Sequence, residues 1–491
     1  MAVEASIQRQ SLWSRPRGIG LIIFALVALW WLMRDNPTAL VILAIVILFI
    51  VGIKKPLWAI AALLLSQLTI TSFMVVTPFA AISLRLLLLV LTLLIMWRAV
   101  VQRQINLGPN ARRVIIPIII LIVVSGIANW INSSVDFAFK DFRNLMVGLL
   151  TVILVPMVIR TSKNLKVLCA VTFFVVVASA VVGLMQHYNI LGMEQATIRP
   201  DFLLTREDNR VPGMAETQLE LSYILTVAIL VSLGVFVTRG ITSSNRILLL
   251  ISMLLMAIVL YFTFTRSSLF ALGLGLIAFP LFLKTRIRWD IVLIVFLVAV
   301  IFIDMTGMLS GQYLGGRSLE VQEESSISRK ILWQAGIAIA LDNPLLGIGG
   351  DQYTEVAPQY ADRVDPSLIA WEKRQYWGYT TLGNEQVHND FLYIWLSYGT
   401  VALLAYLWLY IAILRNLLDA HRKSKRRFIK GLALGLAAAL VAYGVNAFYH
   451  NLMITMPILW IIAGFSMATL KLAQRNSSGQ VHKPAAKTSN S

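Results

Sequence analysis

Charged residues are scarce in this chain, and their scarcity decides the class of protein. They make up 13% of the 491 residues, whereas hydrophobic residues make up 58%. A soluble globular domain carries about 25% charged residues. The composition therefore excludes an ordinary soluble protein and predicts an integral membrane protein.

Cysteine is nearly absent, and patterns typical of metal or phosphate sites are missing. The one cysteine, Cys169, lies within an apolar run, which leaves no disulfide framework and no cysteine-based metal site. The outer segments contain no His-x-x-x-His or Asp-x-Asp pair, so neither a metal nor another cofactor is indicated. Gly347, Gly349 and Gly350 resemble a phosphate loop without its lysine. A turn that closes a helix from Ile327 to Leu341 is the better interpretation.

Long apolar runs predict the fold. A membrane-spanning helix needs roughly 20 apolar residues. Fourteen runs approach this length, centred near residues 26, 46, 66, 91, 121, 151, 176, 228, 255, 275, 298, 403, 438 and 461. We therefore predict an all-α fold, a polytopic transmembrane bundle of about 12–14 helices. The first run lacks a small-residue cleavage site and is interpreted as an uncleaved helix.

One long polar segment interrupts the apolar runs and sets the domain organisation. It carries ten acidic residues and ends just before an apolar run that begins at His388. We expect a cytoplasmic N-terminal segment at 1–17, a transmembrane helical domain at 18–307, an extracytoplasmic cap loop containing helices at 308–387, the remaining transmembrane helices of the same domain at 388–471, and a disordered cytoplasmic tail at 472–491.

Lysine and arginine are distributed unequally between the two sides of this bundle. If successive connections alternate sides, 28 of the 42 Lys and Arg residues share one side with only three of the 24 acidic residues. The positive-inside rule assigns that side to the cytoplasm. Both termini are then cytoplasmic, and the net charge of +18 is a topology signal rather than support for nucleic-acid binding.

Four ionisable residues lie at or near the predicted outer ends of helices. Arg210 has acidic neighbours that could pair with it, and Arg266 could simply extend to lipid headgroups. Considered with His388, however, two arginines can hold a diphosphate through bidentate contacts, and a neutral imidazole can accept a proton from a hydroxyl. His450 repeats the His-Asn pair, and we interpret it as a polar contact at a helix end.

Three segments resemble the O-antigen ligase and polymerase family of bacterial membranes. They are TRSSLFALGLG at 265–275, SRKILWQAGIAIALDNPLLGIGGDQY at 328–353, and VHNDFLYIWLSYGTVALLAYL at 387–407. The resemblance extends over roughly residues 205–410. It implies a metal-independent, inverting glycosyltransferase of the C type. Such an enzyme takes a glycan from undecaprenyl diphosphate at the outer face of the cytoplasmic membrane and passes it to a saccharide hydroxyl.

The resemblance also implies roles for individual residues. Arg210 and Arg266 would hold the diphosphate, Arg206 and Arg329 would be further substrate-binding residues, and His388 would activate the acceptor hydroxyl. Whether Arg206 or Arg210 contacts the diphosphate stays open.

Two alternative functions also stay open. A polymerase would use a second lipid-linked glycan as acceptor, whereas a flippase would carry a polyprenyl-linked sugar across the membrane. Transporters place ionisable residues near the midplane of the bilayer, where this chain has almost none. The sequence therefore favours glycan transfer over transport.

Overall fold

The chain folds into helices throughout the part that the structure describes. The computed structural model describes residues 56–58, 60–61, 107–108, 110–190, 210–215, 217–283, 319–375, 381–452 and 457–477. The helices are α5 (Ala111–Asn132), α6 (Val135–Val158), α7 (Ser162–His187), α8 (Gln218–Val237), α9 (Ser243–Phe262), α10 (Arg266–Leu283), α12 (Leu319–Asp342), α13 (Tyr353–Val356), the 3-10 helix η4 (Ala357–Arg363), α14 (Pro366–Gln375), α15 (Thr381–Asn384), α16 (Asp390–Lys423), α17 (Arg427–Tyr449) and α18 (Ile458–Ser477). The predicted all-α fold is confirmed.

Seven of the described helices are long and apolar enough to cross a bilayer, namely α5, α6, α7, α8, α9, α16 and α17. The shorter apolar helix α10 and the helix α18 match two further predicted runs. A multi-pass helical membrane protein is therefore confirmed. The runs centred near residues 26, 46, 66, 91 and 298 lie outside the described residues, so the count of 12–14 spans stays a prediction.

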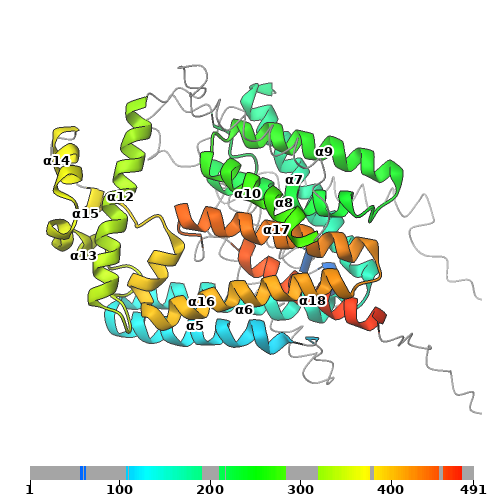
Figure 1. Ribbon diagram of the computed structural model, residues 1–491, viewed down its shortest axis with the longest axis horizontal. Coiled ribbons are helices and arrows are strands. Elements are labelled where there is room, and N and C mark those ends of the chain that lie inside the picture. Colours follow the sequence, from blue (N-terminus) through cyan, green and yellow to red (C-terminus); the bar gives the residue numbers. More distant parts are fainter. Residues whose placement is uncertain are drawn as a thin grey trace, which may run out of the picture.

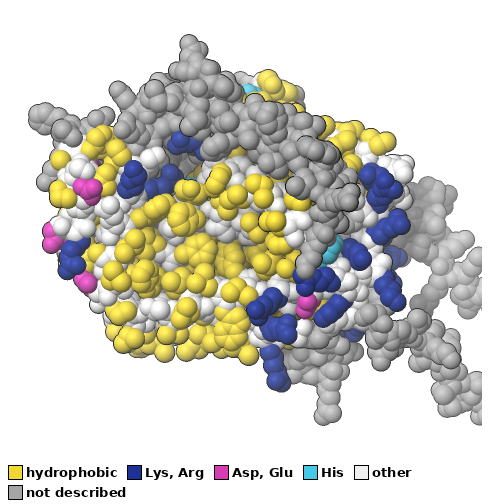
Figure 2. Space-filling model, viewed as in Figure 1, with side chains coloured by type: hydrophobic (Ala, Val, Ile, Leu, Met, Phe, Trp, Pro, Cys, Tyr) yellow, Lys and Arg dark blue, Asp and Glu magenta, His cyan; other side chains and the backbone are white. Residues whose placement is uncertain are grey.

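Basic residues gather at one end of the bundle, which we call the basic end. The end of α16 meets the start of α5 there, where Arg113 Nη1 lies 4.0 Å from Asp419 Oδ2. The start of α17 meets the start of α7, where Arg426 donates a hydrogen bond to Ser162. A continuous apolar surface separates this end from the opposite one (Figure 2). Helices α12 to α15 and η4 form a cap at that opposite end, the cap end (Figure 1).

Small residues bring α8 and α17 into close contact at the centre of the bundle. A Cβ on Gly234 would overlap the backbone of Gly431 and Gly435, and a Cβ on Gly435 would overlap the backbone of Val231. Close approach through small residues is typical of helices in a bilayer, where van der Waals packing drives association. The pair α8 and α17 thereby supports the neighbouring helix α10, whose Gly275 packs between Leu230 and the backbone of α17.

Polar side chains cap the first turns of the long helices. The side chains of Ser134, Thr161, Thr217 and Asn389 accept hydrogen bonds from backbone N–H groups in the first turns of α6, α7, α8 and α16. Such caps satisfy donors that have no partner within the helix. They fix where each apolar run becomes a helix.

Helix α16 breaks at Gly399, and the connection after α12 fills the break. Gly399 has φ 82° and ψ 178°, so the helical hydrogen bonds stop there. Ile348 N–H donates to the Leu396 carbonyl at 2.9 Å, and Gly349 N–H donates to the Ser397 carbonyl at 3.0 Å. Beyond the break, Thr400 N–H donates to the Pro344 carbonyl, just before this connection, at 2.8 Å. Backbone groups released at a kink in a membrane must find partners within the protein, and these bonds supply them.

The glycine-rich connection is therefore a structural element. Gly347 and Gly349 have φ of 65° and 89°, and Cβ atoms there would overlap Ser397 and Ser133. The N–H groups of Ile348 and Gly349 donate to carbonyls of α16, so they do not face a phosphate. The interpretation as a turn that closes a helix is confirmed, although α12 is longer than the predicted Ile327 to Leu341.

A buried polar network joins the same connection to α5, α6 and α16. Asp141 Oδ2 accepts hydrogen bonds from Asn129 Nδ2 at 2.7 Å and from the Tyr398 hydroxyl at 3.0 Å. Gly350 N–H donates to Asn129 Oδ1 at 3.0 Å, and the Gly350 carbonyl accepts from the Tyr393 hydroxyl at 2.8 Å. Buried polar groups in a bilayer need such partners. The network and the break at Gly399 together fasten the cap to the bundle.

Replacing Gly399 by alanine should destabilise the protein strongly. An alanine would occupy a backbone conformation that L-residues rarely adopt, at a cost of about 1–3 kcal/mol, and its methyl group would overlap the Leu345 carbonyl. The thermal unfolding midpoint of the purified variant in detergent measures the effect. Gly126→Ala is the matched control, because among the described residues no atom outside its own stretch of helix lies within 4 Å of the added Cβ. Equal midpoints for the two variants would contradict this account of the break.

Candidate active site

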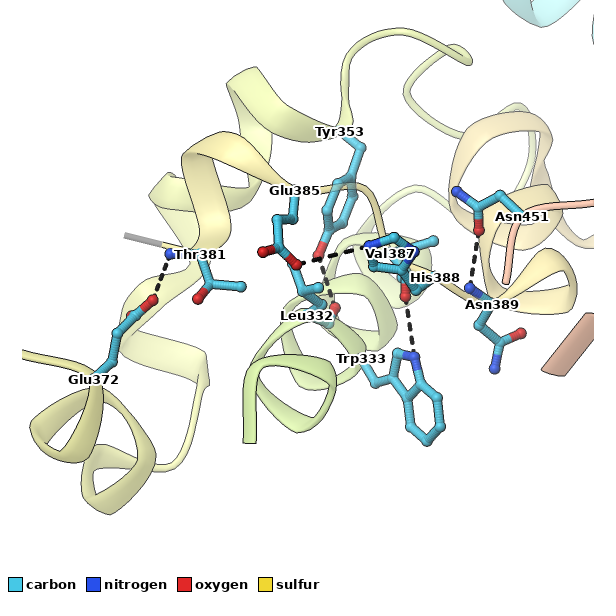
Figure 3. A network of polar contacts seen from close by, with 10 residues as sticks. All are labelled: Leu332, Trp333, Tyr353, Glu372, Thr381, Glu385, Val387, His388, Asn389 and Asn451. Carbon is cyan, nitrogen blue, oxygen red and sulfur yellow. Dashed lines mark hydrogen bonds and ion pairs between the residues drawn. The ribbon is translucent and has the colours of Figure 1, made fainter. Parts of the chain in front are cut away.

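His388 lies at the cap end, on a backbone fixed from both sides. The carbonyl of Val387, just before it, accepts a hydrogen bond from Trp333 Nε1 on α12 at 3.0 Å. The N–H of Asn389, just after it, donates to Asn451 Oδ1 beyond α17 at 2.9 Å (Figure 3). His388 itself has φ 49°, an uncommon value for a residue other than glycine. Contacts from the cap and from the segment after α17 therefore hold the backbone on both sides of His388 in place.

The two residues after His388 have structural roles. The Asn389 side chain caps α16 through Leu392 N–H at 3.0 Å. Asp390 accepts hydrogen bonds from the Tyr406 hydroxyl at 2.7 Å and from Leu452 N–H at 2.9 Å. Both side chains are buried, and only the imidazole of this triplet is partly exposed. His388 is thus the member of His-Asn-Asp whose side chain solvent can reach.

A carboxylate that the sequence analysis did not single out faces His388. Glu385 Oε2 lies 3.7 Å from His388 Nε2, and the two side chains are 37% and 38% exposed. This separation is too long for a hydrogen bond but short enough for electrostatic attraction. The carboxylate can stabilise the imidazolium that forms when His388 takes a proton. The spacing of three residues in Glu-Gln-Val-His was the only sequence signal for this pair.

His450 lies beside His388, at the C-terminal end of α17. Their ring centroids are 6.1 Å apart, and the His450 ring is also 5.7 Å from the Tyr223 ring on α8. Burial lowers the pKa of His450 well below its usual value, and the charge of Arg329 and the neighbouring His388 lower it further. His450 is therefore the expected helix-end residue, and it is also a neutral imidazole adjoining the site.

Arg266 and Arg329 bring two positive charges to the same place. Arg266 is the first residue of α10, and Arg329 lies on α12 of the cap. Burial lowers the pKa of Arg329, and the nearby charge of Arg266 lowers it further, whereas Glu385 acts in the opposite direction. A guanidinium nevertheless stays protonated in proteins. Two adjacent guanidinium groups with fixed orientations can bind an anion with several oxygens, such as a diphosphate.

Hydroxyl and amide groups fix the helix end that carries Arg266. The chain turns sharply through Phe264, which has φ 48°, between α9 and α10. Below Arg266, the Ser268 hydroxyl bonds to Ser222 Oγ on α8 at 2.8 Å and to Asn446 Oδ1 on α17 at 3.3 Å. These contacts join three helices at one level. Ser268, the last residue of Thr-Arg-Ser-Ser, therefore helps to hold the helix end that carries the arginine.

The segment that begins at Arg210 is also anchored at the cap end. Gly213 N–H donates to Gln186 Oε1 at 2.8 Å, and Met214 N–H donates to Ser179 Oγ at 2.9 Å, both on α7. Arg210 is partly buried and precedes these anchored residues, so it shares the cap end with Arg266. Arg206 lies outside the described residues.

The described residues contain no group of three His, Cys, Asp or Glu side chains that could hold a metal ion. Of the acidic residues near His388, Glu385 faces the imidazole, and Asp390 accepts hydrogen bonds from Tyr406 and Leu452.

The stability of the protein should fall as the pH falls below about 6.5, in part because of His450. Unfolded histidine binds a proton below about pH 6.5, whereas the pKa of folded His450 is lower. The unfolded state then binds more protons, so stability is lost as the pH decreases through this window. The unfolding midpoint should decrease less between about pH 7 and 5.5 in His450→Gln than in the wild type. The same decrease in both proteins would refute the buried neutral imidazole.

Comparison with known proteins gives a family match for one part of the chain. No curated protein matches it in sequence. Residues 251–407 match a family model described as O-antigen ligase, and this region contains Arg266, Arg329 and His388. Enzymes of this family transfer glycans from lipid-linked donors to saccharide acceptors, within multi-pass membrane proteins. The helices and the placement of these three side chains agree with that match, so this part of the chain is similar to the O-antigen ligase family.

Proposed function

We propose that this protein transfers a preassembled glycan from undecaprenyl diphosphate to a saccharide hydroxyl, with inversion and without a metal. The observation that supports this most directly is the convergence of Arg266, Arg329 and His388. They come from α10, from the cap and from the residues just before α16. The charge of Arg266 nevertheless acts on Arg329, and His450 is close enough to be affected by both Arg329 and His388. An anion-binding pair beside a proton acceptor is what such a transfer needs.

The two guanidinium groups suit the leaving group. As the bond between the sugar C1 and the diphosphate oxygen breaks, that oxygen gains negative charge. Arg266 and Arg329 would bind the diphosphate in the ground state and stabilise the additional charge in the transition state. Arg210, anchored at the same end by Gly213 and Met214, would contribute a third cation, and Arg206 keeps its proposed place among the substrate-binding residues.

His388 suits the acceptor. Its imidazole would take the proton from the acceptor hydroxyl while the hydroxyl oxygen attacks C1 from the face opposite the diphosphate, which inverts the configuration. Glu385, 3.7 Å away, would stabilise the resulting imidazolium. The proton later leaves to solvent, because the His388 side chain is partly exposed.

We also propose that the cap end faces the extracytoplasmic side of the bacterial cytoplasmic membrane. The basic end then faces the cytoplasm, as the positive-inside rule requires. The domain boundaries keep their places in this proposal, with the cap at 308–387 between transmembrane segments 18–307 and 388–471, and cytoplasmic termini at 1–17 and 472–491.

A membrane-impermeant thiol reagent tests this orientation in intact cells. The native Cys169 is first replaced by alanine. A cysteine at the exposed position Asn384 should then be labelled, whereas one at the exposed position Lys425 should be labelled only after the cells are opened. The reverse pattern would place the cap in the cytoplasm and exclude an extracytoplasmic donor.

Replacing His388 by alanine should lower turnover by about a hundredfold to ten-thousandfold, the contribution of one general base. Donor binding should change little, because the diphosphate contacts belong to the arginines. Release of undecaprenyl diphosphate from a lipid-linked glycan by the purified protein measures the reaction. A His388→Ala protein with wild-type turnover would remove His388 from the mechanism, and a wild-type protein that never cleaves the donor would favour the flippase.

Arg266→Lys is the companion to this test. Lysine keeps the charge but loses the planar pair of donors, so both donor affinity and turnover should fall by about tenfold or more. Arg363→Lys, an exposed arginine of the cap, is the matched control and should retain wild-type activity. Full activity in Arg266→Lys would show that only a charge, or only a helix anchor, is needed there.

A further inference from the structure

A groove at the basic end lies far along α16 from the candidate active site. It has a volume of about 440 Å³ and is formed by α5 and α16. Its lining includes Arg113, Trp408, Ile411, Arg415, Asp419 and Arg422. The proposed glycan transfer uses none of these residues.

The groove carries an excess of positive charge. Its one carboxylate, Asp419, lies 4.0 Å from Arg113 Nη1 and 3.6 Å from Lys423 Nζ. Within the described part of the chain, no carboxylate oxygen lies within 4 Å of Arg415 or Arg422. The guanidinium groups of Arg415 and Arg422, about two helical turns apart on the same side of α16, are therefore available for an anion. Arg113 approaches them from α5.

An exposed apolar face leads from the groove toward the cap end. Val401, Leu404, Trp408 and Ile411 are each between 43% and 60% exposed and recur at helical spacing on α16. Figure 2 shows a continuous apolar surface that ends where the dark-blue side chains begin. One side of α16 is thus apolar along most of its length and cationic at its end.

The length of α16 sets the depth of these cations. As an unbroken helix its 34 residues would extend about 51 Å at 1.5 Å per residue, and the part beyond the break at Gly399 alone, from Thr400 to Lys423, extends about 36 Å, which exceeds the roughly 30 Å thickness of the hydrocarbon core. If the core begins near Asp390, it ends near Ile411, about 20 residues later. Arg415 then lies about 6 Å farther, at the level of the headgroups. Trp408, next to this boundary, has the amphipathic ring that favours the interface.

We propose that this groove binds one anionic phospholipid. The lipid phosphate lies between Arg415 and Arg422, with Arg113 beside it, and an acyl chain lies along the face from Val401 to Ile411. Basic pockets between transmembrane helices are suited to anionic headgroups, because the cations and the apolar wall match the two parts of the lipid. The site requires only that the helices cross a membrane, so it stands or falls independently of the proposed glycan transfer.

Native mass spectrometry of the delipidated full-length protein in detergent tests the proposal. When lipid is added back, the protein should bind one phosphatidylglycerol per chain, at least tenfold more tightly than phosphatidylcholine. Arg415→Gln/Arg422→Gln should weaken phosphatidylglycerol binding about thirtyfold, the expected effect of two surface cations. Lys425→Gln/Arg427→Gln removes the same charge from exposed positions outside the groove and should change binding less than threefold.

Two further measurements separate the possible sources of the signal. Inorganic phosphate in excess should not displace the lipid; displacement by phosphate alone would reduce the site to a free anion site. Photoactivatable phosphatidylglycerol should label the segment from residue 408 to 422 of the wild-type protein, a result that does not depend on how a variant folds. Labelling elsewhere, or equal weakening by both pairs of substitutions, would overturn the proposal.

Discussion

The hydrogen bonds that fill the break in α16 at Gly399 determine where the cap sits on the bundle. Without them, α16 would leave carbonyls and an N–H group without partners at membrane depth, each at a cost of several kcal/mol. The segment after α12 supplies Ile348 and Gly349 N–H for this purpose. Because α12 leads directly into that segment, the position of Arg329 and Trp333 follows from the same bonds.

Trp333 then carries the effect of this anchoring to His388. Its indole N–H holds the Val387 carbonyl, and its ring packs against Phe448 at 5.1 Å and Tyr449 at 6.4 Å at the end of α17. The cap, the start of α16 and the end of α17 thus meet around one side chain. Because three separate elements hold the backbone around His388, this residue can keep its uncommon φ of 49°.

The sequence predicted what depends on local patterns and missed what depends on packing. Apolar runs predicted the long helices, and the polar residues at the ends of those runs predicted that Arg266 and His388 lie at helix ends. The first eight residues of α12, from Leu319 to Ser326, are mostly polar and acidic, so hydrophobic periodicity could not reveal that the helix begins there. Glu385 lies only three residues before His388, but that spacing alone does not show that the two side chains face each other. The approach of His450 was hidden, because a distance between side chains in different elements leaves no mark on the sequence around either one.

The adjacency of Arg266 and Arg329 has a consequence for binding. Two like charges that are held together by the fold repel each other, and the lowered pKa of Arg329 reflects both its burial and that repulsion. The repulsion raises the energy of the site without ligand, and an anion between the two groups relieves it. A neutral His450 adds no third positive charge, so the imidazole of His388 can accept a proton without an additional cation on the His450 side. In the proposed mechanism, the positive charge of Arg266 and Arg329 serves the leaving group, and the imidazole of His388 serves the acceptor.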